Sequence, residues 1–139
     1  MSVVGSRRRA REAALQMLYQ MDVAAMGADE AIARYWDELA TERDGESFAN
    51  ELVRGVERER ERIDALIRGV SEHWRLERMA CVDRNILRLG VYELLAVPDV
   101  PRRVTLNEAI ELAKRFGAEG SAAFVNGVLD RIAADLGKP

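Results

Sequence analysis

A chain of 139 residues with 48% hydrophobic residues is long enough for one domain with a single buried core. It has no run of about 18 apolar residues and no apolar stretch near its N-terminus, which disfavours a membrane-spanning helix and a secretory signal, so we expect a cytoplasmic protein. The net charge of −3 argues against a protein that binds polyanions over its whole surface.

The residue types favour helices. Aromatic residues make up only 6% of the chain, and alanine, leucine, glutamate and arginine, which lose little side-chain freedom in a helix, are abundant. We therefore expect an all-α fold of six or seven helices.

Residues 7–26 are predicted to form the first helix, with Ser6 as its N-cap. Its small and apolar residues recur at the spacing of one helical face. They are Ala10, Ala13, Ala14, Met17, Leu18 and Met21. A second helix is expected over residues 29–43, after Gly27. Its predicted apolar face consists of Ile32, Tyr35, Trp36 and Leu39.

Residues 48–70 are predicted to form two consecutive helices, because the charged run at 57–62 interrupts the apolar positions. The run itself is expected to form solvent-exposed ion pairs rather than a binding site. The next helix, residues 79–95, carries apolar residues on more than one face, so we expect it to be central and buried on several sides. Pro98 and Pro101 end it, since proline and the residue before it disfavour α geometry.

Thr105 and Glu108 have the spacing of a capping box, which predicts a helix that begins near Thr105 and ends before Gly117. A last helix is expected from about Ser121, and it carries Phe124 in its first turn.

Few residues could carry catalysis or hold a metal ion. His73 and Cys81 are the sole histidine and cysteine, and no glycine-rich phosphate loop is present. A lone histidine cannot complete a metal site, and a single cysteine cannot form an internal disulfide, which fits a reducing compartment. We expect a surface or helix-end position for His73, a buried position for Cys81, and a protein that is not an enzyme and needs no cofactor or metal.

The positive charge gathers near the N-terminus, where residues 1–21 hold four arginines and one glutamate, while the remainder holds 17 basic and 23 acidic residues. Arg7, Arg8, Arg9 and Arg11 would crowd at a helix N-terminus, at a cost of about 0.3–1 kcal/mol per charge. Two interpretations stay open from these residues alone. The cluster is either a solvated segment or a phosphate-binding surface, for which the planar, permanently charged guanidinium is suited.

Recognition of single-stranded RNA normally adds an exposed aromatic ring on which an unpaired base can stack. Tyr19 lies off the apolar face of the first helix, and Phe124 lies just after the connection at 117–120. Both are candidates by position, although either residue could equally belong to the core.

Several longer motifs follow one another along almost the whole chain. They are Arg7-Arg8-Arg9-Ala10-Arg11-Glu12 with Leu18-Tyr19, Leu52-Val53-x-Gly55-Val56, Asp83-Arg84-x-Ile86-Leu87-Arg88-Leu89, Asn107-Glu108-Ala109 and Phe124-Val125-Asn126-Gly127-Val128-Leu129-Asp130. Together they resemble the NusB family. The resemblance implies a single domain over residues 1–139, built from about seven helices in two subdomains, with the division at about 72–101.

The resemblance also implies a function. NusB proteins bind the boxA element of nascent ribosomal RNA transcripts together with the small-subunit ribosomal protein that doubles as NusE, and they help RNA polymerase to read through terminators. Some members form homodimers, and for this chain we lean towards a monomer.

By position, the resemblance assigns the RNA backbone to Arg7, Arg8, Arg9 and Arg11. It places Gly120, Ser121 and Phe124 beside the bases, with an acidic residue common in the family where this chain has Gly120. It places Tyr19 and Asp83 at the interface with the NusE-type protein. Glu108 is interpreted as a structural residue of the capping box.

Three alternatives remain. The chain could be an adaptor that binds proteins and no RNA, or the NusB-like regulatory domain of a ribosomal-RNA methyltransferase. A DNA-binding helix-turn-helix regulator is disfavoured, because residues 105–132 mix acidic and basic residues instead of forming a basic recognition helix.

Overall fold

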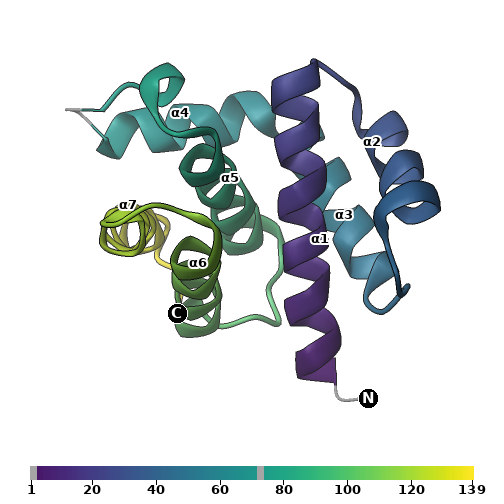
Figure 1. Ribbon diagram of the computed structural model, residues 1–139. Helices are drawn as coiled ribbons and strands as arrows, with labels where there is room; N and C mark the ends of the chain where they lie inside the picture. The colour runs from purple at the N-terminus through teal and green to yellow at the C-terminus, as the bar shows by residue number, and fades with distance from the viewer. Residues whose placement is uncertain (1–2, 72–73) are drawn as a thin grey trace.

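The computed structural model describes residues 3–71 and 74–139, which form seven α-helices and no strand. The helices are α1 (Val3–Ala24), α2 (Ala28–Arg34), α3 (Glu46–Arg58), α4 (Arg60–Val70), α5 (Cys81–Ala96), α6 (Arg102–Phe116) and α7 (Ser121–Leu136) (Figure 1). A π-helical turn, η1 (Tyr35–Leu39), follows α2, and a 3-10 turn, η2 (Leu76–Arg78), precedes α5. The predicted all-α fold is confirmed. No described helix is both long enough and apolar enough to cross a membrane, and His73 lies outside the described residues.

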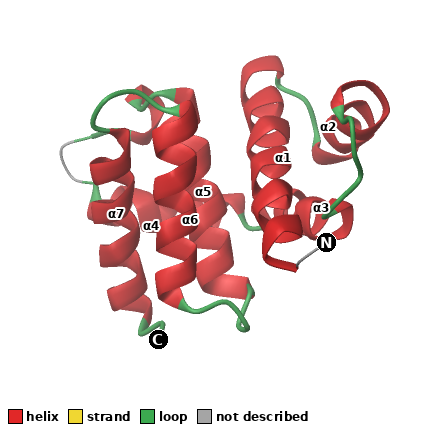
Figure 2. Cartoon of the chain, turned by 60° about the horizontal axis from the view of Figure 1, so that its bottom comes forward, coloured by secondary structure: helices red, strands yellow, loops and turns green. Residues whose placement is uncertain are grey.

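The helices fall into two groups. Helices α1, α2 and α3 lie on one side of the molecule and α4 to α7 on the other (Figure 2). The groups meet mainly where α1 and α3 pack against α5. The chain passes from one group to the other at Glu59, which separates α3 from α4 and lies before the segment 72–101 where the division was expected. One continuous cluster of buried hydrophobic side chains joins both groups.

Helix α5 is the centre of the fold. Residues 85–94 are all buried, and the helix packs against α1, α3, α4, α6 and α7. Glycines allow two of these helices to approach closely: a Cβ on Gly55 would lie 2.1 Å from the ring of Tyr92, and a Cβ on Gly90 would lie 2.7 Å from Leu129. The expectation of a central helix that is buried on several sides is confirmed.

Two expectations about helix ends are wrong. Helix α1 begins at Val3, so Ser6 lies inside the helix and is not its N-cap. The second helix ends at Leu39 instead of residue 43, and its last turn is π-helical, with the amide of Ala40 bonded to the carbonyl of Tyr35. The wider π turn rotates later side chains off the apolar face. Leu39 is therefore 56% exposed, although Trp36 is buried as expected.

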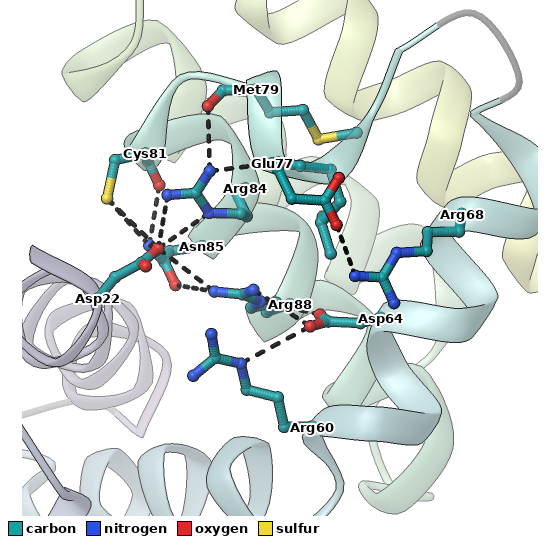
Figure 3. Close-up of polar contacts among 11 residues, drawn as sticks. Asp22, Arg60, Asp64, Arg68, Glu77, Met79, Cys81, Arg84, Asn85 and Arg88 are labelled. Carbon is teal, nitrogen blue, oxygen red and sulfur yellow. Dashed lines mark hydrogen bonds and ion pairs between the residues drawn. The ribbon is translucent and has the colours of Figure 1, made fainter. Parts of the chain in front are cut away.

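A network of charged side chains connects α1 with α4 and α5 (Figure 3). Asp22 on α1 accepts hydrogen bonds from Arg84 Nε at 2.9 Å, Asn85 Nδ2 at 3.0 Å and Arg88 Nη1 at 3.3 Å. Arg88 is buried and also donates to both carboxylate oxygens of Asp64 on α4. Burial acts to raise the pKa of Asp22, but the hydrogen bonds from Arg84 and Asn85 outweigh it, so this pKa lies below its ordinary value. The network therefore links α1, in one group of helices, to α4 and α5 in the other.

Candidate nucleic-acid interface

Arg7, Arg8 and Arg9, which we call the arginine surface, lie in the N-terminal part of α1. Consecutive helical residues point about 100° apart, so the three side chains reach different neighbours. Their acidic partners are Asp99 for Arg7 at 3.1 Å, Glu108 on α6 for Arg8 at 2.8 Å, and Glu42 and Asp44 for Arg9. The arginine side chains remain 32%, 57% and 50% exposed, in that order. They do not form a freely solvated segment, because each is held against the folded protein.

Arg11, the fourth arginine of the predicted RNA-binding set, is buried. Its side chain is 4% exposed and makes a bidentate pair with Glu93 on α5, with Nε and Nη2 at 2.8 and 2.9 Å from the two carboxylate oxygens. Its Nη1 lies 3.4 Å from Glu108. A guanidinium enclosed in this way cannot meet a phosphate without unfolding part of the site. Arg11 instead anchors α1, and with it the arginine surface, to α5 and α6.

The predicted capping box is also wrong. Helix α6 begins at Arg102, directly after Pro101, so Thr105 lies inside the helix and its buried hydroxyl has no hydrogen-bond partner among the described residues. Glu108 accepts hydrogen bonds from Arg8 and Arg11 instead of bonding to the backbone at a helix start. Its hydrogen bond and its charge raise the pKa of Arg8. Glu108 therefore positions Arg8 within the arginine surface.

The positive surface extends towards α6. Arg8 lines a cavity of about 220 Å³ together with Lys114 and Arg115, whose side chains are 63% and 64% exposed. Glu108 and Glu111 line the same cavity. An incoming phosphate would meet exposed cations here, but it would have to compete with carboxylates that already neutralise part of their charge.

The segment at 117–124 forms a second candidate surface. Gly120 is the N-cap of α7 and has φ = +88°, a left-handed conformation that glycine adopts without strain and aspartate tolerates. At this position a ligand can therefore contact only the backbone, because glycine has no side chain. Ser121 is only 4% exposed and its hydroxyl accepts a hydrogen bond from the Ala118 amide at 3.0 Å, so its hydroxyl is already engaged. Phe124 is half-buried against the core.

The structure brings some of the predicted site residues together and separates others. Asp83, Gly120, Ser121 and Phe124 line one cavity of about 310 Å³, which we call the α7 cavity. The arginine surface contributes no residue to it. Tyr19 lies elsewhere on α1 and is 40% exposed. Asp83 is thus grouped with the predicted base-contacting residues and not with Tyr19, its expected companion at a protein interface.

Two residues that matter for these surfaces belong to the motifs that resemble the NusB family, but the sequence interpretation assigned them no function. Trp74 lines the α7 cavity and is 61% exposed, and Glu93 is the buried partner of Arg11. Trp74 gave a usable signal as a large aromatic residue just outside a helix. Glu93 gave none, because it stands inside the apolar sequence of α5 and its partner is 82 residues away.

The single cysteine lies beside the charged network. Cys81 is half-buried, with Sγ 3.5 Å from Asp22 Oδ2. Burial and the charge of Asp22 both raise the pKa of its thiol, which keeps the thiol protonated and weakly nucleophilic at neutral pH. Among the described residues, no three histidine, cysteine, aspartate or glutamate side chains are placed to hold a metal ion.

Comparison with known proteins places the chain in one family. The model of the NusB family matches residues 8–134. The transcription antitermination protein NusB of Sorangium cellulosum is 52% identical over 135 residues, which cover 97% of this chain and 96% of the relative. The protein of the same name from an Anaeromyxobacter species is 59% identical over 131 residues, covering 94% and 91%.

Solved structures agree with this assignment. The structure of T. maritima NusB superposes with a TM-score of 0.85 at 42% identity and covers 93% of this chain and 91% of that one. A crystal structure of the antitermination factors NusB and NusE in complex with double-stranded RNA gives a TM-score of 0.82 at 30% identity, with 94% and 97% covered. The chain belongs to the NusB family.

Proposed function

We propose that this protein is a transcription antitermination factor that binds single-stranded boxA RNA in nascent ribosomal RNA transcripts. It acts with a NusE-type ribosomal protein within the RNA polymerase antitermination complex, in the cytoplasm, and promotes read-through of terminators. The observation that carries the proposal is the arginine surface: three partly exposed guanidinium groups on one end of α1, each paired with an acidic side chain, on a helix that the buried Arg11 anchors to α5. The similarity to a NusB bound to NusE and RNA supports the choice of both partners.

The exposure of each residue indicates its role. Arg7, Arg8 and Arg9 bind phosphates, and Phe124 with the backbone at Gly120 lies beside the bases. The buried side chains of Arg11 and Ser121 position these groups without touching RNA. Tyr19, exposed on α1, belongs to the surface for the ribosomal protein.

The salt dependence of RNA binding tests this division. If each residue of the arginine surface neutralises one phosphate of a single strand, the surface contributes about −2.1 to the slope of log affinity against log salt. A fourth contact from Arg11 would make this about −2.8. Arg8→Ala is expected to reduce the slope by about 0.7, measured by fluorescence anisotropy with a labelled boxA RNA over a salt series.

A matched control is Arg54→Ala. Arg54 is 54% exposed and pairs with Asp29 at 3.4 Å, much as Arg8 pairs with Glu108, but it lies on α3 and lines neither of the two cavities. This variant should leave the slope unchanged. Equal effects of the two variants, or no effect of Arg8→Ala, would mean that the arginine surface does not hold the RNA.

A protein-binding adaptor without an RNA role is the second candidate, because every residue of the arginine surface already has an acidic partner. Binding to boxA RNA and to a scrambled RNA, each with and without the NusE-type protein, separates the two. Selective binding that the ribosomal protein strengthens supports antitermination. Equal, weak binding to both RNAs alongside tight binding to the ribosomal protein supports the adaptor. The proposal takes the monomer as the active form, so a homodimer that covers α1 would compete with RNA.

A further inference from the structure

Trp74 is an exposed indole for which the core offers no explanation. It is 61% exposed, whereas Trp36, the other tryptophan of the chain, is 6% exposed and donates its indole N–H to Asn50 Oδ1 at 2.7 Å. Exposed aromatic rings are the surfaces on which proteins stack unpaired bases. Trp74 is therefore a candidate for ligand contact, and Trp36 is a residue of the core.

Trp74 is held beside Phe124. The two ring centroids lie 6.3 Å apart, and the ring planes make an angle of 73°. Such an edge-to-face pair is favourable in itself and leaves ring faces free for a third planar group. One ring comes from the segment before η2 and the other from the first turn of α7.

Both rings line the α7 cavity, which has a volume of about 310 Å³ and is also lined by Met79, Asp83 and Gly120. This volume lies at the lower end of the range for cavities that hold small ligands. Gly120 keeps one side open, because a Cβ built on it would meet no atom within 4 Å. A planar base thus has both an apolar wall and an unobstructed approach.

Asp83 gives this cavity a chemical preference. Its Oδ1 is buried and has no hydrogen-bond partner among the described residues. A buried acceptor without a hydrogen bond is unfavourable. A ligand that donates a hydrogen bond to Oδ1 therefore binds more tightly, whereas a ligand that places another acceptor there binds more weakly. Adenine, cytosine and guanine carry an exocyclic amino group with two N–H donors. Uracil has only its single N3–H donor, which lies between two carbonyl oxygens that a carboxylate repels.

We propose that Trp74, Phe124 and Asp83 form a nucleobase pocket that accepts a base with an exocyclic amino group in preference to uracil. The proposal rests on the proposed RNA-binding function and assigns its base-selective part, since contacts from arginines to phosphates carry no sequence information. It assigns Asp83 to the contact with RNA instead of the interface with the ribosomal protein. It also makes Trp74 the principal stacking platform, with Phe124 holding it from the side.

The intrinsic fluorescence of the full chain provides the test, because only Trp74 of the two tryptophans is exposed. Titration with oligocytidylate at low salt is expected to quench the emission and to protect it from acrylamide. Trp74→Phe should abolish the quenching, since the buried Trp36 alone remains. Trp74→Ala should lower the affinity for oligocytidylate by at least about fivefold, measured by anisotropy of a labelled oligonucleotide.

Base preference tests the role of Asp83. Wild-type protein should bind oligocytidylate more tightly than oligouridylate of equal length, and Asp83→Asn should reduce this ratio about three- to tenfold. Glu119→Gln is the matched control, because Glu119 lines the same cavity but is exposed. It removes the same charge and should raise the affinity for both oligonucleotides alike without changing their ratio.

The outcomes separate this proposal from the proposed function. Binding that weakens with salt and with Arg8→Ala, but leaves Trp74 fluorescence unchanged, overturns the nucleobase pocket and leaves RNA binding standing. A failure to bind any RNA overturns both. If Asp83→Asn weakens binding of the ribosomal protein and leaves the ratio of the two RNAs unchanged, Asp83 belongs to the protein interface and the pocket is rejected.

Discussion

Replacing Glu93 with alanine is expected to lower the free energy of unfolding by about 3–5 kcal/mol. The carboxylate is 2% exposed and receives two hydrogen bonds from the equally buried guanidinium of Arg11. Its removal leaves that guanidinium in a low-dielectric environment, with the longer hydrogen bond to Glu108, at 3.4 Å, and the ring of Phe48, whose centroid lies 5.5 Å from Arg11 Cζ. Urea denaturation followed by circular dichroism should show a lower midpoint at an unchanged slope.

Two further variants isolate the buried charge as the cause. Glu77→Ala breaks an exposed pair with Arg68 and should cost less than about 1 kcal/mol. The double variant Arg11→Met with Glu93→Leu removes both charges and should recover most of the stability that Glu93→Ala loses. A loss below about 1 kcal/mol for Glu93→Ala would mean that the guanidinium finds water or another partner, and that the pair does not anchor α1.

This anchor has a consequence for binding. Arg11 joins α1 to α5 and α6 through Glu93 and Glu108, and Glu108 also holds Arg8. The exposed guanidinium of Arg8 is therefore positioned by residues of the opposite group of helices. Loss of the anchor should weaken RNA binding at temperatures where the protein is still folded, because the arginine surface would lose its fixed geometry.

The sequence predicts most of the helices because their signals are local. Apolar periodicity correctly indicated the break near Glu59 and the burial of α5, and the last helix begins at Ser121 as expected. The turn at 35–39 was missed, since a π turn inserts an extra residue that periodicity alone does not reveal. Local patterns report the element that a residue belongs to more reliably than where that element ends.

The site was less predictable because its partners are remote in sequence. The three-residue separation of Thr105 and Glu108 matched a local motif, but the partners of Glu108 are Arg8 and Arg11, 100 and 97 residues away. A run of arginines looks uniform in sequence, yet Arg11 is buried while Arg8 is more than half exposed. Charge composition could indicate a phosphate-binding segment, but only the packing of α1 against α5 and α6 decides which arginines reach solvent.

Replacing Arg88 with methionine is expected to destabilise the protein by about 3–5 kcal/mol at neutral pH, for a different reason from that of Glu93→Ala. Arg88 is 4% exposed and donates to Asp64 and Asp22, which come from α4 and α1. Methionine fills much of the same space but leaves these carboxylates without the cation between them. The defect lies where α1 and α4 meet the central helix (Figure 3).

The pH dependence of this loss identifies its origin. Burial acts to raise the pKa of Asp22, but the hydrogen bonds from Arg84 and Asn85 lower it by more. The net shift of this pKa is therefore downward. Its contribution to stability is therefore fully present above about pH 4, the unfolded-state pKa, and is lost as the pH falls through the lower folded-state value. The difference between wild type and Arg88→Met should shrink over this acidic range, because protonated carboxyl groups no longer need the cation. A difference that stays constant from pH 7 to pH 3 would point to a packing defect instead, and the network would then not be what joins α1 to α4 and α5.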